Sequence, residues 1–220
     1  MNNPLELFPA LFLLSCLVLA VSSRMLHLIR VVALQGIMLG VLPLMLSGSL
    51  QFDHWGIAVV HIVLKGIVLP WLLLQAMRRA QVRRELEPLV GYSASAILVL
   101  LFCAGGFWVA KQLILSSVHA ELAVAASFTV ILTGLFIVAS RKKALTQVIG
   151  FLVFENGITL FGIGLMRHHH FLVELGILLD VFVLVFIMGI AVCQISREFS
   201  HIDADKLKSL DDLPEKEAGK

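Results

Sequence analysis

The stretch SRKKALTQVIGFLVFENGITLFGIGLM (residues 140–166) decides the fold. Three basic residues, 141–143, precede an apolar run of 23 residues, which is enough for a helix to cross a hydrocarbon layer of about 30 Å. One acid, Glu155, lies at the centre of that run. The run predicts a membrane-spanning helix, and an ionisable residue inside such a helix marks a candidate functional position.

The composition of the whole chain agrees with this interpretation. Of 220 residues, 59% are hydrophobic and 15% charged, against about 45–50% and about 25% in soluble domains. The mean hydropathy is +0.96. The 17 basic and 15 acidic residues nearly cancel, which gives no sign of a basic face for nucleic acid. The sequence predicts a membrane protein.

Seven apolar runs of spanning length are expected to form transmembrane helices, and the predicted fold class is an all-α polytopic membrane protein. The first run has no basic residue before it, so we interpret it as a helix and not as a signal peptide. The runs cover about residues 7–21, 31–49, 55–77, 89–110, 122–139, 144–166 and 171–195.

The basic residues alternate between the two sides of this arrangement. Nine lie in the loops after the first, third and fifth runs and five lie after the seventh, which makes 14, whereas Lys111 and Arg167 fall on the other side. Basic residues concentrate on the cytoplasmic side of membranes. The N-terminus is therefore predicted outside and the C-terminus in the cytoplasm.

The charged loop before residue 89 divides the chain into two membrane sections. Residues 1–88 form a three-helix section, residues 89–196 form a four-helix section, and residues 197–220 form a charged cytoplasmic tail. The tail is expected to be solvated, and contact with a peripheral partner is the alternative.

Three ionisable residues lie near the middle of predicted helices: Lys65 in the third, Glu155 in the sixth and Asp180 in the seventh. Each costs about 2.5–3.5 kcal/mol to insert, so these groups must be paired, neutral or hydrated. A low dielectric favours their neutral forms, which allows them to exchange protons. They are candidate members of a proton pathway. The alternative is that Lys65 forms an ion pair with Asp180 or Glu155 that only holds helices together.

Polar neighbours surround these three positions. His61 lies one turn before Lys65 and is grouped with the pathway, although a lone histidine is more often a satisfied interior residue. Secondary candidates are Asn156, Thr159 and Glu174, the last close enough to the outer interface to reach water.

Sites of other kinds are not expected in this chain. The three cysteines, Cys16, Cys103 and Cys193, are far apart and are interpreted as apolar filling residues. The run 168–170 of three histidines is interpreted as a solvated loop because consecutive side chains do not converge on one metal ion. No phosphate-binding loop or nucleophile motif is present. We predict a non-catalytic membrane module without cofactors of its own.

A weak internal repeat is present. A shift of 115 residues aligns the third predicted helix with the seventh and places Lys65 on Asp180, and Ser23–Arg24 before the second helix resembles Ser140–Arg141 before the sixth. Duplicated units often carry ion sites at equivalent midplane positions. A duplicated three-helix unit is one interpretation of this pattern.

The segment 140–157, together with the later acids Glu174 and Asp180, resembles the C-terminal region of the hydrogenase-4 component E family. Members are membrane subunits of formate hydrogenlyase-type group 4 nickel–iron hydrogenase complexes. The resemblance covers most of the chain, including Lys65, and its most specific part is Glu-Asn-Gly at 155–157.

Residues of about 121–197 are also similar to the small K subunit of complex I and to the C subunit of multisubunit Na+/H+ antiporters. The match runs from Ile149–Gly150 to Asn156 and includes Gln194. The glutamates of the K subunit fall at Leu152 and near Leu184 of this chain, so Glu155 and Asp180 are each displaced by about one turn.

The resemblance implies a membrane subunit that couples electron transfer in a cytoplasmic arm to proton or Na+ movement in a bacterial or archaeal inner membrane. The nickel–iron centre and iron–sulfur clusters would belong to partner subunits of the peripheral hydrogenase arm, and the membrane partners would include an antiporter-like subunit. The alternatives are a subunit of a cation/proton antiporter without redox function and a structural membrane scaffold.

Overall fold

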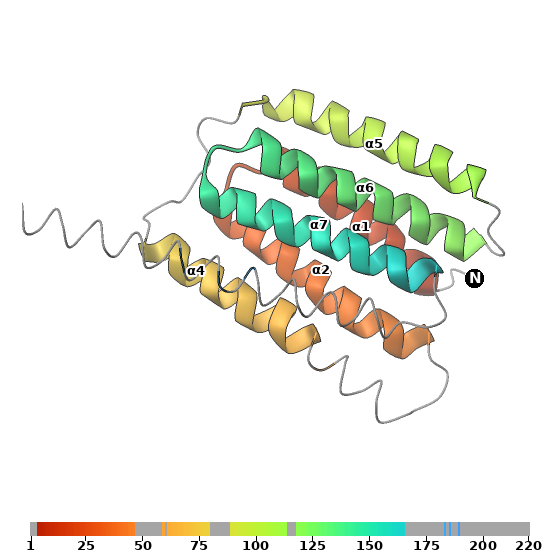
Figure 1. The fold of residues 1–220 in the computed structure, drawn as a ribbon, viewed down its shortest axis with the longest axis horizontal. Helices are drawn as coiled ribbons and strands as arrows, with labels where there is room; N and C mark the ends of the chain where they lie inside the picture. The colour runs from red at the N-terminus through yellow and green to blue at the C-terminus, as the bar shows by residue number, and fades with distance from the viewer. Residues whose placement is uncertain are drawn as a thin grey trace, which may run out of the picture.

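The computed structural model describes residues 4–46, 59, 61–79, 89–113, 118–165, 183, 185 and 189. Across these residues every regular element is a helix and no β-strand occurs, which confirms the all-α prediction. Glu174, Asp180 and the charged tail lie outside the described residues, as does the seventh predicted helix apart from residues 183, 185 and 189. The helices pass back and forth along one bundle axis (Figure 1). They are α1 (Pro4–Val21), α2 (Met25–Leu46), η1 (Ile62–Val68), α4 (Leu69–Arg79), α5 (Tyr92–Gln112), α6 (Val118–Ser140) and α7 (Ala144–Leu165).

Four of these helices are long and apolar enough to cross a membrane. They contain the segments Met25–Pro43, Tyr92–Gln112, Ala120–Ser140 and Ala144–Ile163, and Leu7–Val21 is a shorter apolar helix. The chain is therefore a helical protein with candidate membrane spans in α2, α5, α6 and α7. The count of seven spans stays a prediction.

The second helix begins earlier than predicted. We expected it from residue 31, because Arg24 and Arg30 indicated a loop, but α2 begins at Met25 and includes an exposed Arg30. A long basic side chain at the end of an apolar helix lays its stem along the surface and keeps its charge in a polar environment. The charge therefore marked the end of the apolar span and not the end of the helix.

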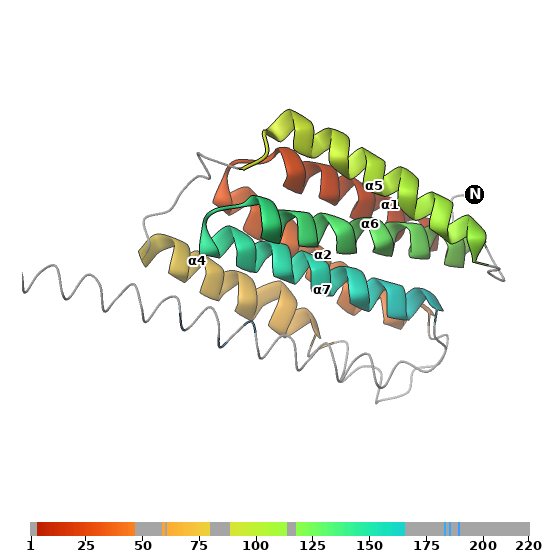
Figure 2. The ribbon, with the colours of Figure 1, turned by 45° about the horizontal axis from the view of Figure 1, so that its top comes forward.

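Two helical hairpins form the centre of the bundle. The first consists of α1 and α2 and the second of α6 and α7, and α1 contacts α6 while α2 contacts α7. In Figures 1 and 2 the paired helices run in the same direction, so the two hairpins lie side by side and parallel. α5 covers α1 and α6, and the η1–α4 segment covers α2.

Glycines bring α6 and α7 together. A Cβ atom at Gly134 would overlap the backbone nitrogen of Phe154, and one at Gly150 would lie 2.8 Å from the nitrogen of Val138. Small residues allow helix backbones to approach closely and gain van der Waals contact where no hydrophobic driving force operates between helices. The α6–α7 hairpin is thus fixed at short range.

One end of the bundle is held by Arg141, which is 3% exposed in the loop between α6 and α7. Its Nη2 donates a hydrogen bond to the carbonyl of Ala20 in the last turn of α1 (3.2 Å). Its guanidinium lies 5.0 Å from the ring centroid of Tyr92 at the start of α5. A cation beside the carbonyl end of a helix is favourable, so Arg141 joins α1, α5 and the α6–α7 loop.

The segment that carries Lys65 is a π-helix. η1 runs from Ile62 to Val68, and the N–H of Leu69 bonds to the carbonyl of Leu64, five residues earlier. Pro70 follows, and because it has no N–H it cannot bond to the carbonyl of Gly66 as an α-helix would require. The wide turn ends before this proline, and turns of this kind often occur at functional sites.

Candidate functional site: a buried ion pair in the helix bundle

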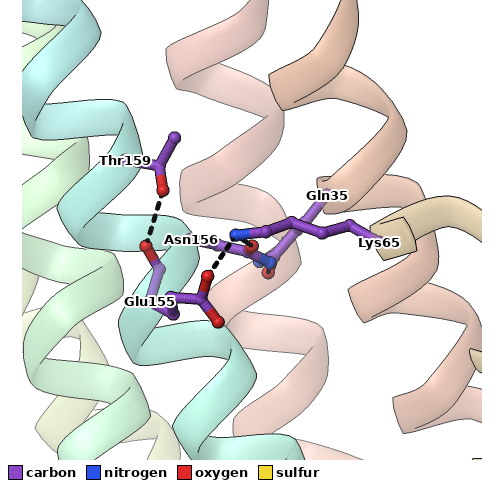
Figure 3. Close-up of polar contacts among 5 residues, drawn as sticks. All are labelled: Gln35, Lys65, Glu155, Asn156 and Thr159. Atoms are coloured by element: carbon purple, nitrogen blue, oxygen red, sulfur yellow. Dashed lines mark hydrogen bonds and ion pairs between the residues drawn. The ribbon is translucent and has the colours of Figure 1, made fainter. Parts of the chain in front are cut away.

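Lys65 and Glu155 form an ion pair inside the bundle (Figure 3). Lys65 Nζ lies 2.7 Å from Glu155 Oε1, and the two side chains are 3% and 1% exposed. They come from η1 and α7, which are 90 residues apart in sequence. Of the pairings considered from the sequence, the described residues show the one between Lys65 and Glu155.

A close contact between helices places the lysine. A Cβ atom added to Gly36 of α2 would lie 2.6 Å from Lys65 Cβ and 2.9 Å from its carbonyl oxygen. A Cβ atom added to Gly66 would meet Ile37 of α2 at 2.7 Å. The π-helix therefore lies directly on α2, and the Lys65 side chain extends past α2 toward α7.

A chain of hydrogen bonds leads from the ion pair to α1. Lys65 Nζ donates to Asn156 Oδ1 (3.4 Å), and Asn156 Nδ2 donates to Gln35 Oε1 (3.2 Å). Gln35 Nε2 donates to Ser15 Oγ (2.6 Å), whose hydroxyl donates to the carbonyl of Phe12 (2.6 Å). The side chains of this polar chain are buried. It connects η1, α7, α2 and α1.

The second oxygen of the Glu155 carboxylate has a different environment. Oε2 is buried and has no hydrogen-bond partner among the described residues. A buried carboxylate oxygen is costly without a donor, so within the described bundle Oε2 is the oxygen of the pair whose hydrogen bonding is incomplete.

The other predicted residues lie nearby with separate contacts. Thr159 donates its hydroxyl to the backbone carbonyl of Glu155 (3.0 Å) and thus bonds to the helix and not to the carboxylate. His61, at the start of the η1 segment, is 5% exposed, and its Nδ1 is without a hydrogen-bond partner in the described part of the chain. Neither residue forms a hydrogen bond with the side chain of Lys65 or of Glu155. Glu174 and Asp180 lie outside the described residues.

Sequence reasoning missed Gln35 and Ser15. A signal for Gln35 is present: Gln35-Gly36-Ile37-Met38-Leu39 of α2 is repeated as 156–160, Asn-Gly-Ile-Thr-Leu, in α7. The shift is 121 residues and not 115. The structure pairs positions at this spacing, since Asn156 bonds to Gln35 and Thr146 Oγ1 bonds to Met25 Sδ, each 121 residues apart. No comparable signal marks Ser15.

The ion pair is suited to moving a proton over a short distance. Burying both charges is expensive and their attraction offsets that expense only in good geometry. If one proton passes from Nζ to Oε1 across 2.7 Å, both groups become neutral. The charged and neutral forms therefore differ by one short transfer, and the polar surroundings decide which form is favoured.

No group of three or more metal-ligating side chains occurs among the described residues. Cys16 and Cys103 are both free thiols. The charged groups brought together inside the described bundle are those of Lys65 and Glu155.

The fold and the site define a class: a helical protein with candidate membrane spans and an ion pair buried between η1 and α7. The chain is 34% identical over 189 residues to the protein named "Uncharacterized protein Rv0085" of Mycobacterium tuberculosis (strain ATCC 25618 / H37Rv), with 84% of this chain and 86% of that protein covered. The chain belongs to the same protein family as Rv0085. No protein-family model matches the chain, and no solved structure matches it.

Proposed function

We propose that this protein is a membrane subunit of a formate hydrogenlyase or hydrogenase-4-type complex, in which Lys65 and Glu155 take part in proton movement. The observation that carries the proposal is the ion pair of 2.7 Å, buried on both sides. Intramembrane ionisable residues mark ion pathways. The resemblance of residues 140–157 to hydrogenase-4 component E supplies the kind of complex.

Within this proposal the protein contributes no redox centre. The nickel–iron site and the iron–sulfur clusters belong to the peripheral arm, and antiporter-like subunits are the membrane neighbours. Electron transfer in the arm changes the electrostatic field in the membrane part, and a proton exchanged between Lys65 Nζ and Glu155 Oε1 responds to that field. The proposed location is the cytoplasmic membrane of a bacterium or archaeon.

The test is Glu155→Gln, with Glu121→Gln in the first turn of α6 as a matched control. In membrane vesicles that contain the whole complex, proton uptake per H₂ formed is expected to fall at least about tenfold in Glu155→Gln and to stay unchanged in the control, since a neutral amide cannot accept the proton. Co-purification of the other subunits checks assembly. Full assembly with unchanged proton uptake would overturn the proposal.

The same experiment separates the alternatives. Loss of assembly with unchanged coupling in the complexes that remain is the result expected of a structural scaffold. Gentle purification of the tagged protein tests the antiporter alternative. A subunit of a cation/proton antiporter is expected to co-purify with antiporter subunits and without hydrogenase subunits.

A further inference from the structure

Gln35 occupies the centre of the polar chain. It is 0% exposed, and both ends of its amide are used: Oε1 accepts from Asn156 Nδ2 (3.2 Å) and Nε2 donates to Ser15 Oγ (2.6 Å). Among the described residues it forms no hydrogen bond with Lys65 or Glu155, and it reaches Lys65 through Asn156. Any effect of Gln35 on the ion pair is therefore indirect.

The hydrogen bonds of the polar chain are all donated in one direction, from Lys65 toward α1. An ammonium group has donors only, so Asn156 presents its oxygen to Lys65 and its NH₂ to Gln35. Gln35 repeats this orientation, with its oxygen toward Asn156 and its NH₂ toward α1. The single hydroxyl proton of Ser15 is used on the carbonyl of Phe12, so Ser15 accepts from Gln35 and fixes the far end.

We infer that Gln35 is a positioning residue for the ion pair: anchored by Ser15, it holds the Asn156 amide with its oxygen toward Lys65. An acceptor in this place favours the charged ammonium, and with it the charged carboxylate of Glu155. The inference deepens the proposed function, on which it rests, by naming what sets the balance between the charged and the neutral pair.

The repeat between α2 and α7 supports this role. The two amides, Gln35 and Asn156, occupy equivalent positions in the repeated motif and bond to each other across the two hairpins. Both are followed by a glycine that makes a close helix contact, Gly36 with Lys65 and Gly157 with Ile131. The repeat thus places an amide and a tight backbone contact at the same depth on both helices.

The charged and titratable groups around Lys65 are few in the described part of the chain. Glu155 faces it from α7, and His61 lies one turn before it on its own segment. Along the polar chain α2 and α1 present neutral groups, Gln35 and Ser15, with the buried thiol of Cys16 next to the serine. A change at Gln35 therefore alters dipoles near the pair without adding or removing a charge.

The test is Gln35→Met in the full chain, reconstituted in lipid nanodiscs, with the protonation of Glu155 followed by infrared spectroscopy across pH. Glu155→Gln assigns the carboxyl band. Methionine keeps the length of the side chain and removes both polar groups, so the Asn156 amide loses its anchor. The ratio of protonated to ionised Glu155 at a given pH is expected to rise on the order of tenfold, because a hydrogen bond to a charged group is lost.

Three further variants serve as controls. Ser15→Ala removes the anchor of Gln35 and is expected to change the ratio in the same direction by less, whereas Ser15→Thr keeps the hydroxyl and leaves the ratio unchanged. Gln147→Met is the matched control, since Gln147 Nε2 bonds to the carbonyl of Arg141 at the end of the bundle. It is expected to have no effect on the Glu155 band.

A folded Gln35→Met protein with an unchanged Glu155 band would overturn the inference. If Gln35→Met does not fold, an unchanged band in Ser15→Ala overturns it instead. Failure of the proposed function gives a different pattern: the band responds to Gln35→Met as described, but Glu155→Gln leaves proton uptake by the whole complex unchanged.

Discussion

At the scale of single residues, Lys65 and Glu155 serve two purposes that mutagenesis can separate. A buried ion pair stabilises a fold little compared with apolar residues of the same volume, but breaking it by removing one partner leaves a buried charge. Stability therefore depends on treating the pair as a unit, whereas proton movement depends on the chemistry of each group.

The first prediction compares single and double replacements. Lys65→Met alone leaves Glu155 without its 2.7 Å partner and is expected to lower the free energy of unfolding by about 3–5 kcal/mol. Adding Glu155→Met is expected to recover most of that loss, because both charges are then absent. Unfolding in mixed detergent micelles measures both values. A double variant as unstable as Lys65→Met would contradict this account of the pair.

Lys65 and Glu155 were predictable from the sequence because a charge inside an apolar run is expensive and therefore conspicuous. Which acid pairs with the lysine was not, since pairing depends on how η1 and α7 pack. Gln35 and Ser15 gave no charge signal, and a neutral polar residue in a spanning helix is common enough to pass unnoticed. Asn156 was predicted as a secondary candidate of the proton pathway, but its contact with α2 required the structure.

At the scale of helices, neighbouring glycines in α5 face different surroundings. A Cβ atom at Gly106 would lie 2.6 Å from the carbonyl oxygen of Ala125 and 3.0 Å from Thr129 Oγ1 of α6, whereas one at Gly105 would meet nothing within 4 Å. Gly106 is buried and Gly105 is exposed. Gly106 is therefore a position at which α5 packs closely on α6.

The second prediction compares substitutions at Gly106 and Gly105. Gly106→Ala is expected to destabilise the protein by about 1–3 kcal/mol, because the added methyl group pushes α5 away from the backbone of α6. Gly105→Ala is expected to be neutral or to stabilise by up to about 1 kcal/mol, since alanine is the better helix former. Thermal unfolding in detergent compares them. Equal changes in stability in both variants would contradict the close packing of α5 on α6 at Gly106.

The helices themselves were largely predictable, because a spanning helix is set by the length of its apolar run. The described helices match the first six predicted runs with shifts at their ends, as at Met25 of α2. The π-helix was not predicted. It is a local change in hydrogen bonding around Gly66 and Pro70, which the hydropathy of the segment does not register.

At the scale of the whole molecule, the connection between α1 and α2, the end of α4 and the loop between α6 and α7 lie at one end of the bundle (Figure 1), and each contains basic residues. The bond from Arg141 to Ala20 and that from the N–H of Leu89 to the carbonyl of Ser140 (3.0 Å) bring the end of α1, the start of α5 and the α6–α7 loop together. Lys111 lies in the last turn of α5, at the other end. From this distribution the positive-inside rule predicts that the basic end lies in the cytoplasm.

The third prediction tests that orientation with a cysteine added at one of two exposed positions. Gln112→Cys, at the far end of α5, is expected to react with a membrane-impermeant maleimide in intact cells. Lys142→Cys, at the basic end, is expected to react only after the membrane is opened, because the reagent cannot cross it. The parent chain, which has Cys16, Cys103 and Cys193, measures background labelling. The reverse pattern would place the basic end outside.

The parallel direction of the two hairpins explains the place of α5 in the chain, although α5 is less buried than the other candidate spans. A unit with an odd number of passes, such as α1, α2 and the η1–α4 segment, ends on the opposite side from where it began, so a second copy joined directly to it would be built upside down. One additional pass restores the original sense. α5 supplies that pass between Gly91 and Leu113, and α6 then starts from the same end as α1. α5 is thus the pass that gives the α6–α7 hairpin the same direction as the α1–α2 hairpin.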